Sequence, residues 1–288
     1  MCKDGMFDNH IDNIEYTKNL FGEEISKSKI IDRLKFFPTT IWQPNWNNTK
    51  ILKKEINDTC QTRKTLNSNR SDRRHGVNGK PSVFNPDLAI KILSVYCPKE
   101  ANIYDPFAGG GTRGYIAKKM GNNYSGVELR IEEVNRIKNQ MKLWNEHFNL
   151  KSGNSEDIHY DNKFNFSYTC PPYYDLEKYS DLDNDLSNAK TYADFLIMIK
   201  NVLKTTYDLL EDNSFCIWVV GNFRNKKGEL VSFNADTIHI AKEQGFKLWD
   251  EIIWNGASNV ALTRIGKFEK NKKAIRIHEY ILVFKKCN

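Results

Sequence analysis

Residues 102–129 read NIYDPFAGGGTRGYIAKKMGNNYSGVEL and carry three consecutive glycines near their middle. Within this stretch, 102–105 and 124–128 predict short strands, and 112–120 predicts a helix. Glycine lets the backbone come close to a ligand, and the first turn of a helix offers free amide groups. Glu128 ends the second strand, where a carboxylate can accept hydrogen bonds from ribose hydroxyls. The stretch therefore predicts a cofactor site at a strand–loop–helix turn.

The segment Asp105-Pro106-Phe107 separates the first strand from the glycines. It makes the loop longer and more acidic than a pyrophosphate favours, and a carboxylate suits a cofactor that carries an ammonium and a sulfonium. Three consecutive glycines are costly to order, which disfavours a turn without a ligand. The glycines also satisfy G-x-G-x-x-G, so a nicotinamide-dependent oxidoreductase stays open as an alternative.

Strands and helices alternate along the chain from Pro81 to the last strand. This alternation predicts an α/β fold with a mostly parallel sheet and helices on both faces. Residues 1–79 instead predict a partly helical arm, with a short helix near 23–36 and a basic end. The further helices are expected near 86–96, 131–144, 192–210 and 234–244, and the further strands near 164–169, 214–220, 247–254 and 277–285.

The composition is that of a soluble globular protein: of 288 residues, 40% are hydrophobic and 27% are charged. No apolar stretch approaches the roughly 20 residues of a membrane span, and the N-terminus lacks the apolar core of a secretory signal. We therefore expect a cytoplasmic protein of a bacterial, archaeal or phage-infected cell. The six cysteines form no C-x-x-C pair, which argues against a zinc knuckle and a disulfide framework. No metal site is predicted.

The formal net charge of +7 is concentrated in two segments, 63–80 and 264–276. Two basic segments suit a polyanionic partner such as nucleic acid. Each segment taken alone fits a solvated loop equally well.

A Pro-Pro corner follows the strand predicted at 164–169, and its sequence is Cys170-Pro171-Pro172-Tyr173. In open α/β sheets, ligands bind at the carboxyl ends of strands, near the point where the strand order reverses. Two prolines remove two amide donors, so the carbonyl groups of the corner can face an amino group. The ring of Tyr173 offers a flat surface on which a base can stack.

DPFAGGGT at 105–112, followed by TCPPYY at 169–174, resembles the amino-group DNA methyltransferases that methylate N6 of adenine or N4 of cytosine. The resemblance is closest to phage-encoded methylases with S/T-C-P-P-Y boxes, and it covers most of 80–286. It implies a Rossmann-like S-adenosylmethionine-dependent fold with a mostly parallel seven-stranded sheet. Three further segments carry the resemblance: 80–93, 153–155 and 278–286.

The resemblance implies a catalytic role for Cys170, Pro171, Pro172 and Tyr173, with S-adenosylmethionine as cofactor. Cys170 departs from the family's Asp, Asn or Ser, and a thiol is a weak acceptor, so the Pro171 carbonyl would hold the target amino group, helped by Asp175 or Glu177. The residues that the resemblance assigns to the cofactor are Phe84, Pro86, Asp105, Pro106, Phe107, Gly109, Gly111, Thr112, Glu128, Leu129, Asn154 and Ser155.

The resemblance also implies site-specific methylation of double-stranded DNA, as in restriction–modification systems, with the target base flipped onto Tyr173. Residues 80–288 would form the catalytic domain, with a DNA-contacting insert at about 256–276. Adenine is favoured over cytosine, and a homodimer is left open. An RNA or protein amide methyltransferase and an inactive DNA-binding relative remain alternatives. The residues expected to contact DNA are Arg70, Arg73, Arg74, Arg264 and Lys267.

Overall fold

The computed structural model describes residues 16–18, 24–26, 38–58, 84–174, 179–256, 268 and 270–287. The chain divides into two compact units, Met1–Pro38 and Thr39–Asn288. In the first unit, β1 (Tyr16–Lys18) pairs with β2 (Glu24–Ser26) in an antiparallel sheet. Strand β2 lies where the helix at 23–36 was predicted, so that prediction is wrong for these three residues. The other residues of that helix lie outside the described ones.

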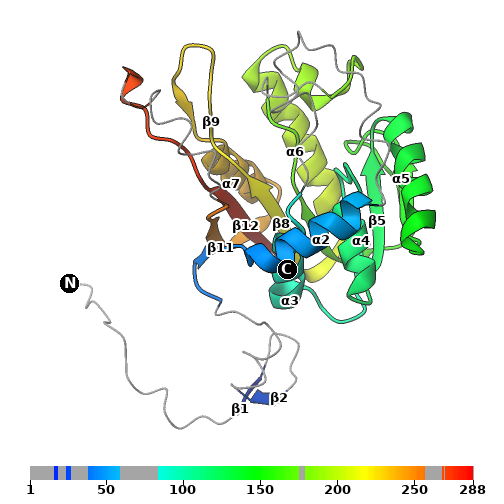
Figure 1. The fold of residues 1–288 in the computed structure, drawn as a ribbon. Helices are drawn as coiled ribbons and strands as arrows, with labels where there is room; N and C mark the ends of the chain where they lie inside the picture. The colour runs from blue at the N-terminus through cyan, green and yellow to red at the C-terminus, as the bar shows by residue number, and fades with distance from the viewer. Residues whose placement is uncertain are drawn as a thin grey trace. The chain divides into compact units, whose positions relative to one another are not determined.

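The second unit is built on an eight-stranded sheet with the order β3-β11-β12-β8-β7-β4-β5-β6 (Figure 1). Within this sheet, β12 runs antiparallel to both of its neighbours, and every other pairing is parallel. The mostly parallel sheet is therefore confirmed. The strands are β3 (Ile41–Trp42), β4 (Asn102–Asp105), β5 (Asn123–Glu128), β6 (Asn149–Ser152), β7 (Phe164–Thr169), β8 (Leu210–Val220), β11 (Phe246–Trp254) and β12 (Glu279–Lys286).

The prediction of seven strands is wrong by one, because the edge strand β3 comes from residues assigned to the arm. Strand β3 pairs in parallel with β11, and Trp42 lies opposite Trp254 in the register. Trp42 is buried while Ile41 is exposed. Two residues are too few to give the alternation that marks a strand in a sequence. A separate two-stranded antiparallel sheet joins β9 (Phe223–Arg224) to β10 (Leu230–Val231).

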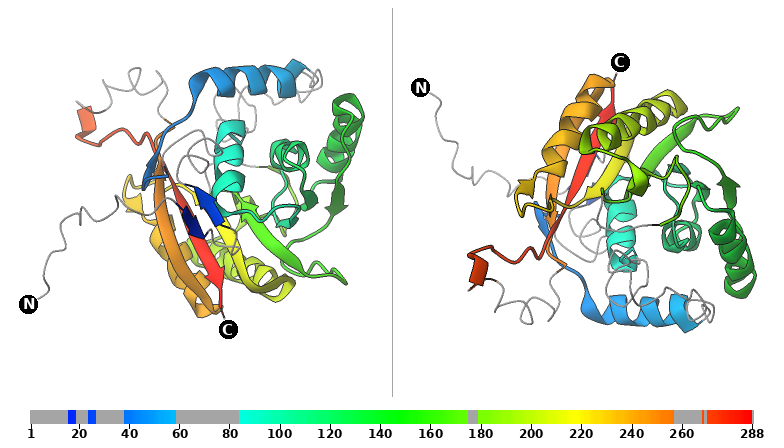
Figure 2. Two further views of the ribbon diagram at one scale, coloured as in Figure 1. Left: turned by 90° about the horizontal axis from the view of Figure 1, so that it is seen from below. Right: turned by 90° about the horizontal axis from the view of Figure 1, so that it is seen from above.

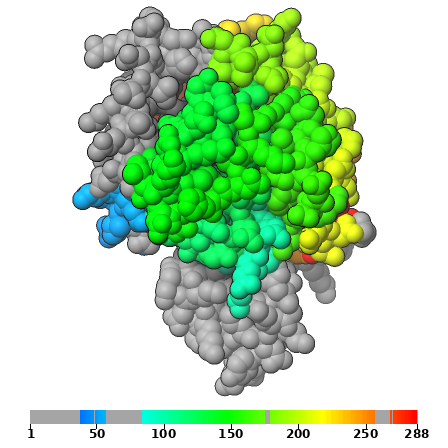
Figure 3. Space-filling view, turned by 90° about the vertical axis from the view of Figure 1, so that its right-hand side faces the viewer, coloured from blue at the N-terminus to red at the C-terminus, as the bar shows by residue number. Residues whose placement is uncertain are grey.

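Helices cover both faces of the large sheet, as predicted (Figure 2). One face carries α6 and α7, and the other carries α3, α4 and α5. The outer side of α5 forms part of the green surface in Figure 3. The helices are α2 (Trp46–Asp58), α3 (Pro86–Tyr96), α4 (Thr112–Lys119), α5 (Ile131–Trp144), α6 (Tyr192–Leu209) and α7 (Phe233–Glu243).

Local chemistry fixes the ends of these helices. Thr191 begins α6 with a capping box: its hydroxyl accepts from the Asp194 amide, and the Asp194 carboxylate accepts from the Thr191 amide. Asn85 caps α3 in a similar way, and Pro86 occupies the first helical position, where its missing amide costs nothing. From its capped start, α6 buries one apolar face in a core cluster that it shares with β8 and β12.

Helix α2 places part of the predicted arm inside the second compact unit. It packs on α3, and it buries Thr49 and Ile56. The hydroxyl of Tyr115 on α4 donates to the Glu55 carboxylate, and the Asn45 amide donates to Asp87 Oδ2 at 2.8 Å. The boundary of the compact unit therefore falls at Thr39, and not at residue 80 as the sequence predicted.

The strand order reverses between β4 and β7. From β4 the chain proceeds outward through β5 to β6, and it then returns to the other side of β4 as β7. Ligands of open α/β sheets bind outside the carboxyl ends of the strands at such a reversal. The loop after Asp105 and the corner after Thr169 are therefore neighbours at the carboxyl edge of the sheet.

Among the described residues, no helix has both the length and the apolar character that a bilayer span requires. The described part of the chain also brings together no group of three or more His, Cys, Asp or Glu side chains suited to a metal ion. The described cysteines Cys97, Cys170, Cys216 and Cys287 are free thiols.

Candidate active site

A cavity of about 430 Å³ lies at the carboxyl edge of the sheet, beyond the ends of β4, β5, β6 and β7. The glycine loop and the Pro-Pro corner both line it, so the structure brings the two motifs into one space. The predicted residues that line the cavity are Phe84, Pro106, Phe107, Gly109, Thr112, Glu128, Leu129, Asn154, Ser155, Cys170, Pro171, Pro172 and Tyr173.

The glycine loop takes a backbone path that other residues would strain. Gly109 and Gly111 have φ values of 52° and 81°, in the left-handed region. Gly111 precedes the first turn of α4, and a Cβ at this position would lie 3.0 Å from Cγ2 of Ile137 on α5. Gly111 therefore shapes the loop through its close contact with α5, and it does not itself line the cavity.

Asp105 is fully buried, and it does not line the cavity. Its carboxylate accepts hydrogen bonds of 2.6 Å from Arg113 Nε, from the Tyr124 hydroxyl and from the Thr169 hydroxyl. The Phe107 amide adds a fourth at 3.0 Å. The carboxylate that was predicted to hold the cofactor instead joins β4 to β5, β7 and α4. Pro86, the start of α3, likewise lies away from the cavity wall.

Arg113 is the cationic partner of Asp105, and it was not among the site residues predicted from the sequence. It is buried, lines the cavity, and donates to the Phe107 carbonyl as well as to Asp105. Its guanidinium carbon lies 4.8 Å from the centre of the Phe84 ring, a cation–π contact. Burial lowers the pKa of Arg113, but its neighbours, Asp105 first among them, together raise it above its usual value. Arg113 is therefore a fixed positive charge in the wall of the cavity.

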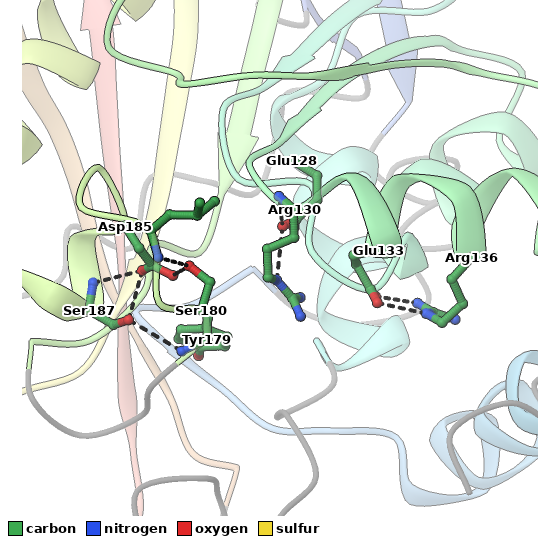
Figure 4. Close-up of polar contacts among 9 residues, drawn as sticks. Glu128, Arg130, Glu133, Arg136, Tyr179, Ser180, Asp185 and Ser187 are labelled. Carbon is green, nitrogen blue, oxygen red and sulfur yellow. Dashed lines mark hydrogen bonds and ion pairs between the residues drawn. The ribbon is translucent and has the colours of Figure 1, made fainter. Parts of the chain in front are cut away.

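Glu128 ends β5, and only one of its two carboxylate oxygens accepts hydrogen bonds from the described residues. Its Oε1 accepts from the amide of Arg130 at 3.0 Å and from Nε of Arg130 at 3.3 Å (Figure 4). Among the described residues, Oε2 has no hydrogen-bond partner. Burial raises the pKa of this carboxyl, and Arg130 opposes the rise. Ser155, which also lines the cavity, donates to the Pro106 carbonyl and so ties the turn after β6 to the glycine loop.

The segment before α6 forms another wall that was not predicted. Asp185 accepts from the hydroxyls of Ser180 and Ser187 at 2.6 and 2.7 Å, and from the Ser187 amide at 2.9 Å (Figure 4). These bonds fold the segment into a compact turn. Its residues that line the cavity are Tyr179, Asn184, Asp185 and Leu186.

The Pro-Pro corner meets the antiparallel strand β12. The Tyr173 hydroxyl donates to Oε1 of Glu279 at 3.2 Å, and the Tyr173 ring makes an edge contact with Phe233 of α7. Burial raises the pKa of Tyr173, and the nearby Glu279 carboxylate adds to the rise. The hydroxyl therefore stays protonated and acts as a donor to Glu279.

Some residues of the cavity wall come from segments that carry no motif: Trp46 and Lys53 come from α2, and Trp254 ends β11. Glu279 begins β12 inside segment 278–286, which carries the resemblance, but it was not among the predicted site residues. A charged residue at the start of the apolar run YILVF was the available signal for Glu279. The predicted DNA contacts Arg70, Arg73, Arg74, Arg264 and Lys267, and the predicted helpers Asp175 and Glu177, lie outside the described residues.

The strand order and the position of the cavity define the fold of the S-adenosylmethionine-dependent methyltransferases. A methyltransferase from Pyrococcus furiosus shares this fold, with a TM-score of 0.50, 12% identity, and coverage of 82% of this chain and 100% of that one. A candidate RNA methyltransferase from Pyrococcus horikoshii also has a TM-score of 0.50, with 15% identity and coverage of 83% and 100%. At such identities the similarity is one of fold.

A family model described as DNA methylase matches residues 11–139 and 164–288, and the chain belongs to this family. The chain is 27% identical over 96 residues to the type II methyltransferase M2.DpnII of Streptococcus pneumoniae. This match covers 33% of this chain and 36% of the relative. It is 28% identical over 91 residues to M2.LlaDCHI of Lactococcus lactis subsp. cremoris, covering 31% and 34%. The matches thus span about a third of these relatives. The closeness to phage-encoded methylases stays a prediction.

Proposed function

We propose that this protein transfers a methyl group from S-adenosylmethionine to the exocyclic amino group of a base in double-stranded DNA. The observation that carries the proposal is the shared cavity: in a member of the DNA methylase family, the glycine loop and the Cys170–Tyr173 corner line one space. A cofactor and a base held by these two segments would meet without leaving the cavity.

The cavity suits S-adenosylmethionine in size and in chemistry. Its volume of about 430 Å³ lies in the range of small-molecule sites. The open Oε2 of Glu128 can accept hydrogen bonds from ribose hydroxyls, and Phe84 and Phe107 offer apolar surface beside it. When bound, the cofactor supplies an electrophilic methyl group. Because Asp105 is occupied by protein donors, we assign it no contact with the cofactor.

The residues of the corner would position the acceptor. An exocyclic amino group is a weak nucleophile, and hydrogen bonds from its N–H groups to fixed acceptors direct its lone pair away from the ring. Pro171 is buried in the cavity wall, and neither proline has an amide that would compete for acceptors. In the transfer, a nitrogen–carbon bond forms as the sulfur–carbon bond breaks. S-adenosylhomocysteine, the methylated base and a proton are the products.

The base must leave the duplex to enter a cavity of this kind. We propose adenine as the favoured base and retain cytosine, because both carry the required amino group. The basic segments around Arg70–Arg74 and Arg264–Lys267 are proposed phosphate contacts, so affinity for DNA should fall steeply as salt rises.

The test is incubation of the full chain with tritiated S-adenosylmethionine and either duplex DNA or RNA. We expect label in DNA. Mass spectrometry of the digested DNA should identify the modified nucleoside as N6-methyl-2′-deoxyadenosine. Label confined to RNA or to protein would refute the proposal. In a parallel melting experiment, S-adenosylhomocysteine should raise the melting temperature and NAD should not; the reverse would favour an oxidoreductase.

A further inference from the structure

Glu279 lines the cavity and accepts a hydrogen bond from Tyr173 of the Pro-Pro corner. It is the first residue of β12, and because β12 is antiparallel, its start lies at the carboxyl edge of the parallel strands. It pairs with Trp254, the last residue of β11, in the register of the sheet. Glu279, Trp254 and Cys170–Tyr173 all line the same cavity.

The carboxylate of Glu279 has unused hydrogen-bonding capacity. The Tyr173 hydroxyl donates to Oε1, and Oε2 has no hydrogen-bond partner in the described part of the chain. Burial raises the pKa of this carboxyl, while Tyr173 and Arg276 lower it. Glu279 is half-buried, and a partly desolvated carboxylate normally accepts several hydrogen bonds. Its Oε2 is therefore available to a ligand in the cavity that Glu279 lines.

The neighbouring Arg276 does not donate a hydrogen bond to the open Oε2 of Glu279. Arg276 Nη1 and the Tyr173 hydroxyl would each lie 3.2 Å from a Cβ at Gly221, so the guanidinium lies beside Tyr173 at the end of β8. Arg276 is exposed, and it forms no ion pair with Glu279 among the described residues. Because Gly221 has no side chain, Arg276 and Tyr173 can both lie close to the backbone at this position.

We propose that Glu279 binds the exocyclic amino group of the target base through Oε2, so that β12 supplies the carboxylate acceptor of the site. The inference rests on the proposed function. The thiol at Cys170 is a weak acceptor, whereas an amino group with two N–H donors needs two good ones. The Pro171 carbonyl is one of them, and Glu279 is the other. Tyr173 is then a positioning residue, because its hydroxyl holds Oε1 and leaves Oε2 open.

This arrangement also selects among bases. Adenine and cytosine present an amino group to the carboxylate, and each would donate a hydrogen bond to it. Thymine presents a carbonyl oxygen at the corresponding position, and two acceptors facing each other repel. A site built around Glu279 therefore admits amino-bearing bases and rejects thymine.

The kinetic test compares the wild-type protein with Glu279→Gln and Glu279→Ala, and with Glu251→Gln as the matched control. Glu251 lies on the neighbouring strand β11, is exposed, and does not line the cavity. We expect kcat to fall about 10-fold or more for Gln and about 100-fold or more for Ala. Affinity for S-adenosylhomocysteine should not change, and the control should keep its kcat within twofold.

A second-site variant separates binding of the base from support of Tyr173. Cys170→Asp places a carboxylate at the corner, and in the Glu279→Ala background it should restore kcat at least about fivefold. A structural role for Glu279 predicts no such rescue. Unchanged kcat in both Glu279 variants, or a loss that Cys170→Asp does not relieve, would overturn the inference.

A binding measurement keeps the inference separate from the proposed function. In the presence of S-adenosylhomocysteine, saturation-transfer NMR should detect adenosine or cytidine on the wild-type protein, but not thymidine. Glu279→Ala should abolish that signal, and Glu251→Gln should preserve it. If the wild-type protein methylates no DNA, the proposed function fails, and this measurement alone decides the role of Glu279. A signal that survives Glu279→Ala would overturn it.

Discussion

Two carboxylates lie at the same edge of the sheet and differ in what surrounds them. Asp105, at the end of β4, is fully buried and accepts from Arg113, Tyr124 and Thr169. Glu279, at the start of β12, lines the cavity and accepts from Tyr173 alone among the described residues. The first has no capacity left for a ligand, and the second has an open oxygen. Near a cavity, the number of unused acceptor positions thus separates a structural carboxylate from a candidate binding group.

The largest expected effect is on the structural carboxylate. Asp105→Asn leaves the Arg113 charge buried without its partner, and this should cost about 3 to 5 kcal/mol of unfolding free energy. Urea denaturation of both proteins measures the loss. Asp208→Asn is the control: its pair with Lys204 is exposed, and it should cost about 0.5 kcal/mol or less. A small loss for Asp105→Asn together with loss of S-adenosylhomocysteine binding would make Asp105 a ligand after all.

The loop that follows Asp105 should respond almost as strongly. Gly111→Ala meets a left-handed backbone and a Cβ contact of 3.0 Å with Ile137, so we expect a loss of about 3 kcal/mol. Gly121 has φ of 80° but open space around it, so Gly121→Ala should cost only about 1 to 2 kcal/mol. Denaturant unfolding compares the two variants. Equal losses would show that α5 does not constrain the loop.

A pH series examines the open carboxylate. Burial raises the pKa of Glu279 above its value in the unfolded chain, so the folded state favours the protonated carboxyl, which predominates at low pH. Its contribution to stability is lost as pH rises from the unfolded pKa through the folded one. Unfolding free energies of wild type and Glu279→Gln should therefore diverge in favour of the variant as pH rises, by no more than about 1.4 kcal/mol per pH unit. A difference that shrinks with pH would contradict the environment described for Glu279.

The smallest expected effect is that of Tyr173→Phe. It removes the hydrogen bond to Glu279, so unfolding free energy should fall by about 0.5 to 1 kcal/mol. Since this bond lowers the pKa of Glu279, its loss should move the pH window of the previous experiment upward. Tyr174→Phe is the neighbouring control, because its hydroxyl makes only a 3.5 Å contact with the Lys190 carbonyl. An unmoved window for Tyr173→Phe would show that the two groups act independently.

The parts of the fold that the sequence predicts well are those with strong local signals. Strands β4 and β7 begin and end where predicted, and α3, α6 and α7 match within a residue or two. Their apolar periodicity, caps and glycines all point to the same structure. The motifs likewise predict that the glycine loop and the corner share one site, because both follow strands next to the reversal of strand order.

The remainder depends on contacts between distant residues. The short strands β3 and β6 show no alternation of apolar and polar residues, and α2 buries few side chains. These three elements therefore have no clear hydrophobic pattern in the sequence. Asp105 looks like a ligand until its burial with Arg113 is known. Glu279 is 106 residues from Tyr173, and only the register of β12 brings the two together. Pairings across a sheet are not encoded in either local stretch.

The inclusion of α2 and β3 in the compact unit sets a lower limit on any working fragment. A version beginning at Lys80 would keep both sequence motifs, yet it would lack Trp46 and Lys53 in the cavity wall and would lose the pairing of β3 with Ile253 and Trp254 of β11. Truncation upstream of Thr39 spares these parts, so the shortest fragment that folds by itself should start there, although the recognisable motifs begin some forty residues later.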